Sequence, residues 1–175
     1  KDSLWWAGTK RNMTTSRTYF IGRNFPLPNQ DIWETDDFPN AWMFRREIID
    51  NNIFFDESFV IHYEEGDFAM RVLEKFNYKF YVVKKAIIYH DVDLNDSFTQ
   101  KRRWLDVRRV YYTARNRVLF HKKYSKKGEY IIFILFWNWL FVLYYLRYIY
   151  NIKDATLKER AASILSYLKG SVSLI

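Results

Sequence analysis

The feature that most constrains this chain is a stretch of 17 consecutive uncharged, mostly apolar residues, from Tyr130 to Leu146. A helix needs about 20 such residues to cross the roughly 30 Å hydrocarbon core of a bilayer. The stretch reaches that length if the Arg147 side chain extends to the headgroups and the helix continues through Ile152. Tyrosines near both ends resemble the aromatic belts of membrane interfaces. The sequence therefore predicts a membrane-associated helix over 129–150; the alternative is a buried helix of a soluble bundle.

The charge of the chain changes sharply just before this stretch. Residues 101–127 contain 11 Lys and Arg side chains against Asp106 alone, a net charge of +10, whereas residues 1–100 have a net charge of −4. Such a basic segment beside a membrane helix is expected at the cytoplasmic face, where it attracts anionic lipid headgroups. Both flanks of the apolar stretch are positive, which favours a helix in one leaflet over a single span. Membrane lipid is therefore the predicted partner. No nucleic-acid partner is expected, because no nucleic-acid-binding motif accompanies the basic segment.

The composition excludes several classes of function. The chain has no cysteine, which removes disulfides, zinc–thiolate sites and cysteine nucleophiles. It has five glycines, and neither Gly-x-Gly-x-x-Gly nor the P-loop pattern occurs. The chain begins at Lys1 without a signal peptide, so we expect it to be a fragment of a longer protein.

Hydrophobic periodicity predicts an α/β domain over 1–100, with an incomplete sheet, and a helical tail over 101–175. Residues 1–40 read as loops with one or two short strands, because they contain all three prolines. The predicted strands after them cover 41–44, 79–83 and 86–90. The predicted helices cover 45–52, 64–76, 101–124, 129–150 and about 155–168, the last ending near Gly170.

Acidic side chains cluster at the start of the predicted helix over 64–76. Glu64, Glu65 and Asp67 fall within four positions, where each carboxylate raises the pKa of the others. That arrangement suits a general base or a metal site. Acidic residues that merely complement the helix dipole are the alternative.

A second polar cluster, His90 with Asp91 and Asp93, follows the predicted strand over 86–90. Strand ends are where α/β sheets bind ligands, and imidazole with carboxylates can hold Mg²⁺ or Mn²⁺. The alternative is a surface loop with a solvated histidine.

Several motifs in fixed order resemble a known enzyme family. An apolar run ends in Arg45-Arg46-Glu47, and a Phe-Asp-Glu-Ser-Phe turn covers 55–59. The aromatic-Glu-Glu-x-Asp helix start at 63–67 follows, then Tyr78-Lys79, Tyr89-His90 and Arg115-Asn116-Arg117. Over about 36–120, this order resembles the second half of a family 2 inverting glycosyltransferase of the rhamnosyltransferase-like, membrane-associated kind.

The resemblance implies a GT-A fold, here the second half of its Rossmann-like sheet followed by the membrane-associated helical tail. It implies inverting transfer of a sugar from a nucleotide-sugar donor to a glycan or lipid-linked acceptor in polysaccharide biosynthesis, with a divalent cation, Mg²⁺ or Mn²⁺. The donor-binding half would be missing from this chain, so the isolated chain is expected to be inactive.

The resemblance also assigns roles to residues. The catalytic base falls on Glu65, with Asp67 in reserve and Glu64 binding the acceptor or orienting the base. His90 falls on the metal ligand. Three residues near the predicted strand over 41–44 would line the acceptor pocket, although a turn and a core aromatic explain them equally well: Asp36, Asp37 and Trp42.

Two other functions remain open. The chain could be a non-catalytic membrane-associated subunit that lends its acidic cluster or basic helix to a partner. It could also be an interaction module whose basic helix binds nucleic acid rather than anionic lipid.

Overall fold

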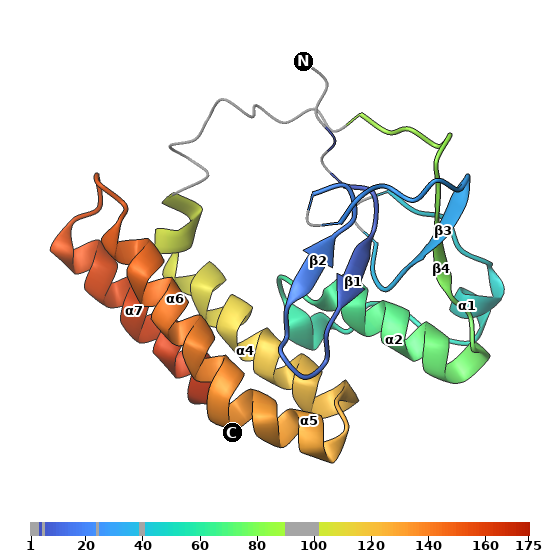
Figure 1. Ribbon diagram of the computed structural model, residues 1–175. Helices are drawn as coiled ribbons and strands as arrows, with labels where there is room; N and C mark the ends of the chain where they lie inside the picture. Colours follow the sequence, from blue (N-terminus) through green and yellow to red (C-terminus); the bar gives the residue numbers. More distant parts are fainter. Residues whose placement is uncertain (1–3, 5, 24, 39–40, 90–101) are drawn as a thin grey trace. The chain divides into compact units, whose positions relative to one another are not determined.

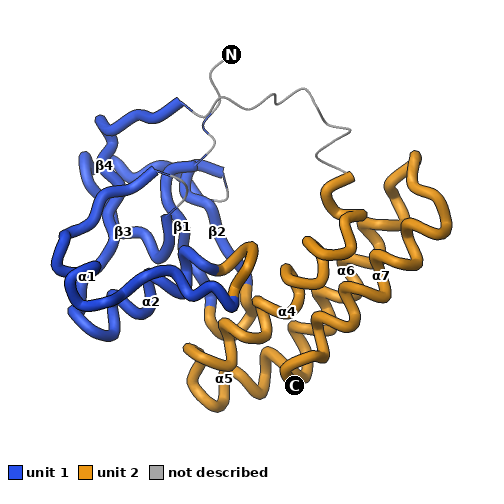
Figure 2. The backbone as a smooth tube through the Cα atoms, turned by 180° about the vertical axis from the view of Figure 1, so that it is seen from behind, with its two compact units in different colours: residues 1–12, 17–58, 64–90 blue, residues 13–16, 59–63, 91–175 orange. Residues whose placement is uncertain are grey.

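A computed structural model describes residues 4, 6–23, 25–38, 41–89 and 102–175 (Figure 1). The chain divides into two compact units, which Figure 2 colours separately. The α/β unit comprises residues 1–12, 17–58 and 64–90, and the helical unit comprises residues 13–16, 59–63 and 91–175. The predicted boundary near residue 100 lies outside the described residues. Segment 59–63, which the sequence placed in the first part, belongs to the helical unit.

The α/β unit confirms the predicted mixture of helix and strand. Its strands form two separate antiparallel pairs, β1 with β2 and β3 with β4. In the second pair Trp33 lies opposite Val82, so the buried Trp33 ring packs on the neighbouring strand. The bounds are β1 Thr9–Arg11, β2 Thr18–Phe20, β3 Ile32–Thr35, α1 Glu47–Asp50, the 3₁₀ turn η1 Glu57–Phe59, α2 Glu64–Phe76 and β4 Phe80–Val83.

Helix α2 has the bounds that its sequence predicts. Phe68, Ala69 and Val72 recur at helical spacing and are buried against Phe38 and Ile48. The helix ends at Phe76 because Asn77 adopts a positive φ of 56°, a conformation that asparagine tolerates better than most residues. Helix α1 is also close to its predicted range, and Asn52, with φ of 58°, follows it.

Two predicted strands of this unit are wrong. Residues 41–44 form no strand, and the Met43 side chain is 97% exposed. The apolar run is instead irregular, because its rings pack as an aromatic cluster rather than in a pleat: Trp42 contacts Phe38 and Phe44 with ring centroids 4.5 Å apart. Residues 86–89 also lack strand pairing, while the rest of that predicted strand lies outside the described residues.

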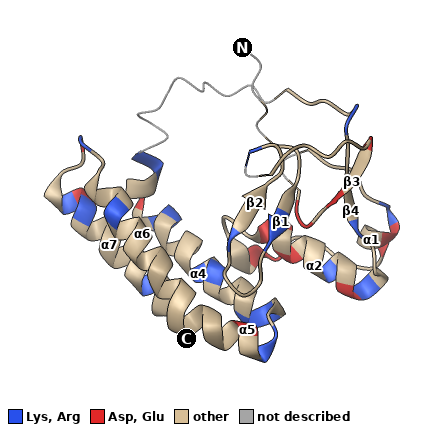
Figure 3. Cartoon of the chain, in the orientation of Figure 1, with Lys and Arg blue, Asp and Glu red and all other residues tan. Residues whose placement is uncertain are grey.

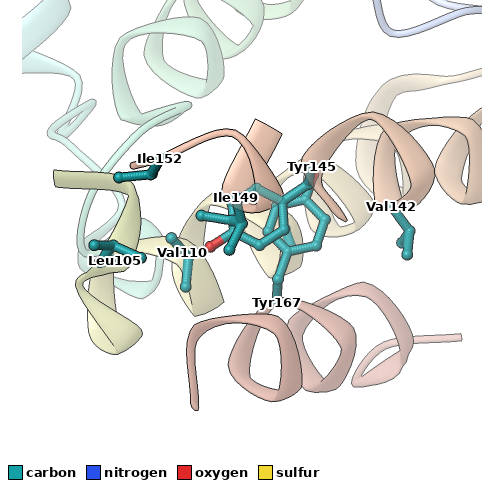
Figure 4. Close-up of a cluster of buried hydrophobic side chains, with 8 residues drawn as sticks. Leu105, Val110, Val142, Tyr145, Ile149, Ile152 and Tyr167 are labelled. Atoms are coloured by element: carbon teal, nitrogen blue, oxygen red, sulfur yellow. The ribbon is translucent and has the colours of Figure 1, made fainter. Parts of the chain in front are cut away.

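In the helical unit, three long helices and a 3₁₀ turn surround one apolar core (Figure 4). Its elements are the 3₁₀ turn η2 Arg103–Leu105, α4 Val107–Tyr124, α5 Lys127–Ile132, the π-helical turn η3 Phe133–Trp137, α6 Asn138–Tyr150 and α7 Leu157–Val172. Asp106 caps α4 by accepting hydrogen bonds from the backbone amides of Arg108 and Arg109. Thr156 and Glu159 form a capping box at the start of α7.

Segments α5, η3 and α6 run on as one helix from Lys127 to Tyr150, which is long and apolar enough to cross a membrane. The π-helical turn in its middle has a physical reason. Phe133 and Asn138 are both buried but lie five positions apart, one more than an α-helical face allows. A wider turn, closed by the hydrogen bond from the Asn138 amide to the Phe133 carbonyl, keeps both on the same side.

Helix α7 continues past the glycine that the sequence predicted as its end. Gly170 is buried within the helix, and its missing side chain lets the α7 backbone approach α4 closely. A Cβ atom at Gly170 would lie 3.1 Å from the Ala114 Cβ and would overlap the Tyr111 carbonyl oxygen. Gly170 is therefore a packing contact rather than a helix stop.

We expect Gly170→Ala to lower the free energy of unfolding by about 1–3 kcal/mol, because α4 and α7 must move apart. Gly128→Ala is the matched control, since no described atom lies within 4 Å of a Cβ at that helical position. It should leave stability unchanged or raise it by up to about 1 kcal/mol. Thermal unfolding followed by circular dichroism compares the two variants, and equal melting temperatures would contradict the close approach.

Candidate functional site

The strongest chemical feature of the α/β unit is the carboxyl pair at the start of α2. Burial first, and then the neighbouring charges of Glu64 and Asp37, together raise the pKa of Glu65 to about 7. A hydrogen bond between the Glu64 and Glu65 side chains acts in the same direction. A carboxyl with a pKa near 7 can accept a proton at neutral pH, which is what a general base requires.

Asp67, the reserve candidate for the base, is occupied differently. Its carboxylate is fully buried and accepts a hydrogen bond from Arg71 Nε at 2.8 Å, one turn along α2. Arg71 in turn donates to the Phe54 carbonyl oxygen at 2.5 Å. This chain of contacts fixes the loop before α2, so the geometry favours Glu65 over Asp67 as the base.

The Asp36–Asp37 pair fastens β1 to the end of β3. Asp36 accepts hydrogen bonds from Lys10 Nζ at 2.9 Å and from the Arg11 backbone amide at 2.7 Å. Asp37 pairs with the Arg11 guanidinium at 2.5 Å. Asp37 also lies within electrostatic range of Glu65, so the structure brings these two predicted site residues together. Asp36, in contrast, holds β1 against the end of β3 through its hydrogen bonds with Lys10 and Arg11.

Trp42 lines a cleft of about 1040 Å³ in the α/β unit. Its walls come from segments 35–48 and 77–88, and they present Phe44, Tyr78 and Tyr81 beside Trp42. Aromatic faces of this kind are suited to a ligand with a ring and a few polar groups. The cleft is not lined by Glu64, Glu65, Asp36 or Asp37. It is lined by Thr35 and Phe38, which flank the two aspartates in the sequence. The segment from Thr35 to Phe38 therefore contributes both to the cleft and, through Asp37, to the electrostatic surroundings of Glu65.

The segment just before Glu64 has an unusual backbone. Val60, His62 and Tyr63 adopt positive φ values of 36°, 65° and 71°. These are disfavoured conformations for residues other than glycine, above all for the β-branched Val60. Strain of this kind persists only where surrounding contacts enforce it, and such residues cluster at functional sites.

Asn116 of α4 enforces that backbone. Its fully buried side-chain amide donates to the carbonyl oxygens of Phe59, Ile61 and His62, at 2.6, 2.8 and 3.1 Å. Its own oxygen accepts a hydrogen bond from Arg115 at 2.9 Å. The two hydrogens of one amide group are therefore shared among three carbonyls of a five-residue segment. We refer to these three hydrogen bonds as the Asn116 clamp.

The side chains of segment 59–63 are held by the same helix. Tyr63 hydrogen-bonds Arg117, and its ring lies 5.3 Å from that of Phe120. The Lys123 ammonium lies 5.2 Å from the centre of the Phe59 ring. The peptide that leads into Glu64 is thus fixed on α4 at both of its ends.

His62 carries a neutral imidazole at pH 7. Burial, with the positive charges of Arg109 and Arg117, lowers its pKa to about 4. Its Nε2 atom is buried and has no hydrogen-bond partner among the described residues. The imidazole can therefore act as a neutral donor or acceptor in this segment, but not as a cation at neutral pH.

The predicted metal ligand His90 lies outside the described residues, as do Asp91 and Asp93. Among the residues that are described, no three His, Asp or Glu side chains lie together as a metal site requires. Glu64 and Glu65 alone do not form one, so the described part of the chain does not by itself fit Mg²⁺ or Mn²⁺.

Comparison of the chain with protein-family models, with curated proteins and with solved structures found no match.

Sequence reasoning missed the clamp. Its signal was an asparagine in the middle of a helix, where asparagine is disfavoured unless its side chain finds a specific partner. It also missed His62 and the proximity of Asp37 to Glu65, because these depend on contacts between residues far apart in the chain.

We expect one glutamate carboxyl to titrate near pH 7, and to be absent from Glu65→Gln. Glu64→Gln should bring the pKa of Glu65 down towards its ordinary value, because it removes the neighbouring negative charge. Carboxyl ¹³C chemical shifts followed from pH 3 to 9 measure this directly. Glu74→Gln, an exposed change on the same helix, is the control. A Glu65 carboxyl that titrates below pH 5.5 would contradict the site.

The same pKa fixes the sign of a stability effect. Since Glu65 holds its proton to a higher pH when folded, the native state binds more protons than the unfolded state between pH 4.5 and 7. The free energy of unfolding should therefore fall as pH rises through this window, and less steeply in Glu65→Gln.

We expect Asn116→Asp and Asn116→Ala to lower the free energy of unfolding by about 1–3 kcal/mol, because buried carbonyls lose their donor. Asn151→Ala is the matched control. Asn151 is exposed and donates one hydrogen bond, to the Arg147 carbonyl at 2.9 Å, so the change should stay within about 0.5 kcal/mol. Thermal unfolding measures the difference, and a loss in Asn116→Ala no larger than in the control would refute the clamp.

Proposed function

We propose that this chain is the acceptor-binding and base-carrying half of a family 2 inverting glycosyltransferase with a GT-A fold. The observation that carries the proposal is the Glu65 carboxyl, whose pKa of about 7 suits a general base, at the position that the family motif assigns to the base. The order of the other motifs, from Arg45-Arg46-Glu47 to Arg115-Asn116-Arg117, supports the same family. The donor-binding half is proposed to lie outside these 175 residues.

In the proposed reaction, Glu65 accepts the proton of an acceptor hydroxyl as the hydroxyl oxygen attacks the anomeric carbon of the donor sugar. The bond from that carbon to the nucleoside diphosphate breaks on the opposite side, so the configuration inverts. The bonding electron pair leaves with the diphosphate. Burial, with the neighbouring charge of Glu64, keeps the pKa of the base near 7, and Glu65 accepts the hydroxyl proton in its ionised form.

The cleft beside Trp42 is the proposed acceptor site. Aromatic rings provide flat apolar faces for sugar rings, while Arg45 and Lys79 supply polar groups at its walls. The proposed acceptor is a glycan or a lipid-linked glycan. Asp37, whose charge acts on Glu65, would orient the hydroxyl.

We also propose that His90 is a ligand of a divalent cation, Mg²⁺ or Mn²⁺, which would neutralise the departing diphosphate. No further ligand is assigned among the described residues. A position at the cytoplasmic face of a membrane is likewise proposed, from the basic segment beside the apolar helix.

The test is sugar transfer by the full-length protein with Glu65→Gln. We expect kcat to fall by roughly 10²- to 10⁴-fold, because the hydroxyl proton loses its acceptor. In the wild type, kcat/KM should rise with pH up to about 7, since the base acts in its ionised form. Glu74→Gln makes the same chemical change on the exposed side of α2 and should retain full activity. Unchanged transfer in Glu65→Gln would favour the alternative, a non-catalytic membrane-associated subunit.

A further inference from the structure

The helix from Lys127 to Tyr150 has one face that the protein leaves uncovered. Of its 18 most apolar residues, 22% are buried, so the described part of the chain leaves most of them uncovered. Its exposed apolar side chains recur in adjacent pairs every four residues, which keeps them on one side of the helix. We call these eight residues the apolar stripe: Ile131, Ile132, Leu135, Phe136, Trp139, Leu140, Leu143 and Tyr144.

The opposite face of this helix is fixed within the helical unit. Asn138 is buried and donates to the Ser171 carbonyl of α7 at 3.1 Å. The Tyr145 hydroxyl donates to the Trp104 carbonyl at 2.7 Å, and its ring stacks on Tyr167 of α7 with centroids 4.0 Å apart. Tyr145 and Tyr167 lie in the apolar core of the unit (Figure 4), and the buried Asn138 would lose its acceptor if the helix left α7.

The helices that hold it are highly charged. Helix α4 carries six Lys and Arg side chains, and α7 carries Lys158, Glu159, Arg160 and Lys169. In Figure 3 most of the helix from α5 through α6 is tan, the colour of uncharged residues, whereas blue Lys and Arg residues recur along α4. If the apolar helix crossed a bilayer, its packed neighbours would bring these charges into the hydrocarbon, where each is costly.

Positive charge lies at both ends of the apolar helix. Lys126 and Lys127 lie at its start, and Arg147 and Lys153 lie near its end. The described residues of the helical unit from 102 to 175 carry 15 Lys and Arg against four Asp and Glu, a net charge of +11. Positive charge at both ends gives a spanning helix no preferred direction across the bilayer. It suits a helix that lies along an anionic membrane surface, where both ends meet lipid headgroups.

We propose that the helical unit binds an anionic phospholipid surface, with the helix from Lys127 to Tyr150 lying in the plane of one leaflet and its apolar stripe inserted. The chemistry of the occupant follows from the stripe, which matches acyl chains, and from the basic ends, which match phosphate headgroups. This inference uses the membrane association proposed above but not the sugar transfer. Glu65→Gln should therefore bind vesicles as the wild type does, whatever its activity.

Vesicle binding by the full chain tests the partner. We expect binding to phosphatidylcholine vesicles containing 30% phosphatidylglycerol to be at least tenfold tighter than to phosphatidylcholine alone. The double variant Leu135→Glu/Leu143→Glu should weaken it at least tenfold, because it places charges in the stripe. Ile87→Glu changes an exposed apolar residue of the α/β unit and should have no effect. Equal binding by both variants would overturn the proposal. So would tighter binding to duplex RNA, or lipid-free dimerisation that the stripe variant abolishes.

Cysteine labelling distinguishes an in-plane helix from a spanning one. Because the chain has no cysteine, single variants report one position each. Gly128→Cys and Lys153→Cys mark the two ends of the helix, and Phe136→Cys marks the stripe. With the chain added to sealed vesicles, an impermeant maleimide outside should label both ends, and lipid should protect Phe136→Cys at least tenfold. Protection of one end alone would show a spanning helix, and labelling of all three at the lipid-free rate would show no insertion.

Discussion

Three hydrogen bonds from the side-chain amide of Asn116 hold segment 59–63, where three of the five residues have positive φ values. The carbonyls of Phe59, Ile61 and His62 all accept from that one buried group, and the backbone around them adopts positive φ values that isolated residues avoid. The chain passes directly from this segment into the helix that begins with Glu64 and Glu65. The clamp therefore fixes the backbone of segment 59–63, which ends directly before Glu64.

The carboxyl groups of Asp67 and Glu65, both at that helix start, differ in role because their surroundings differ. Asp67 is buried with an arginine partner one turn away and serves as a structural anchor. Glu65 is buried beside another glutamate, so burial and like charge raise its pKa to about 7. Sequence alone offered both as bases, because both lie within the same motif. Partners brought in by folding separate a structural carboxylate from one that can accept a proton at neutral pH.

Contacts made on folding also bear on the long apolar helix of the helical unit, which the sequence left as either a spanning or an in-plane helix. Length and composition describe a helix that could cross a bilayer. It packs on α7 through Asn138 and on the 3₁₀ turn η2 through Tyr145, and Phe133 stacks on His121 of α4, so it is joined to charged helices. This packing is the reason that we propose a helix in the plane of a leaflet rather than a spanning one. The close approach of α7 to α4 at Gly170, which resembled a helix end in the sequence, helps to form that body.

The sequence by itself determined the elements that local forces control. The apolar period of α2, the long apolar helix, the strand over 80–83 and the abrupt change of charge all follow from neighbouring residues. It gave the wrong structure for 41–44, because an apolar run near Trp42 satisfies either a pleated strand or an aromatic cluster, and only long-range contacts choose between them. Tertiary structure also decided the Asn116 clamp, the raised pKa of Glu65 and the buried face of α6. Each depends on groups distant in the chain, since burial and pairing energies arise only when folding brings such groups together.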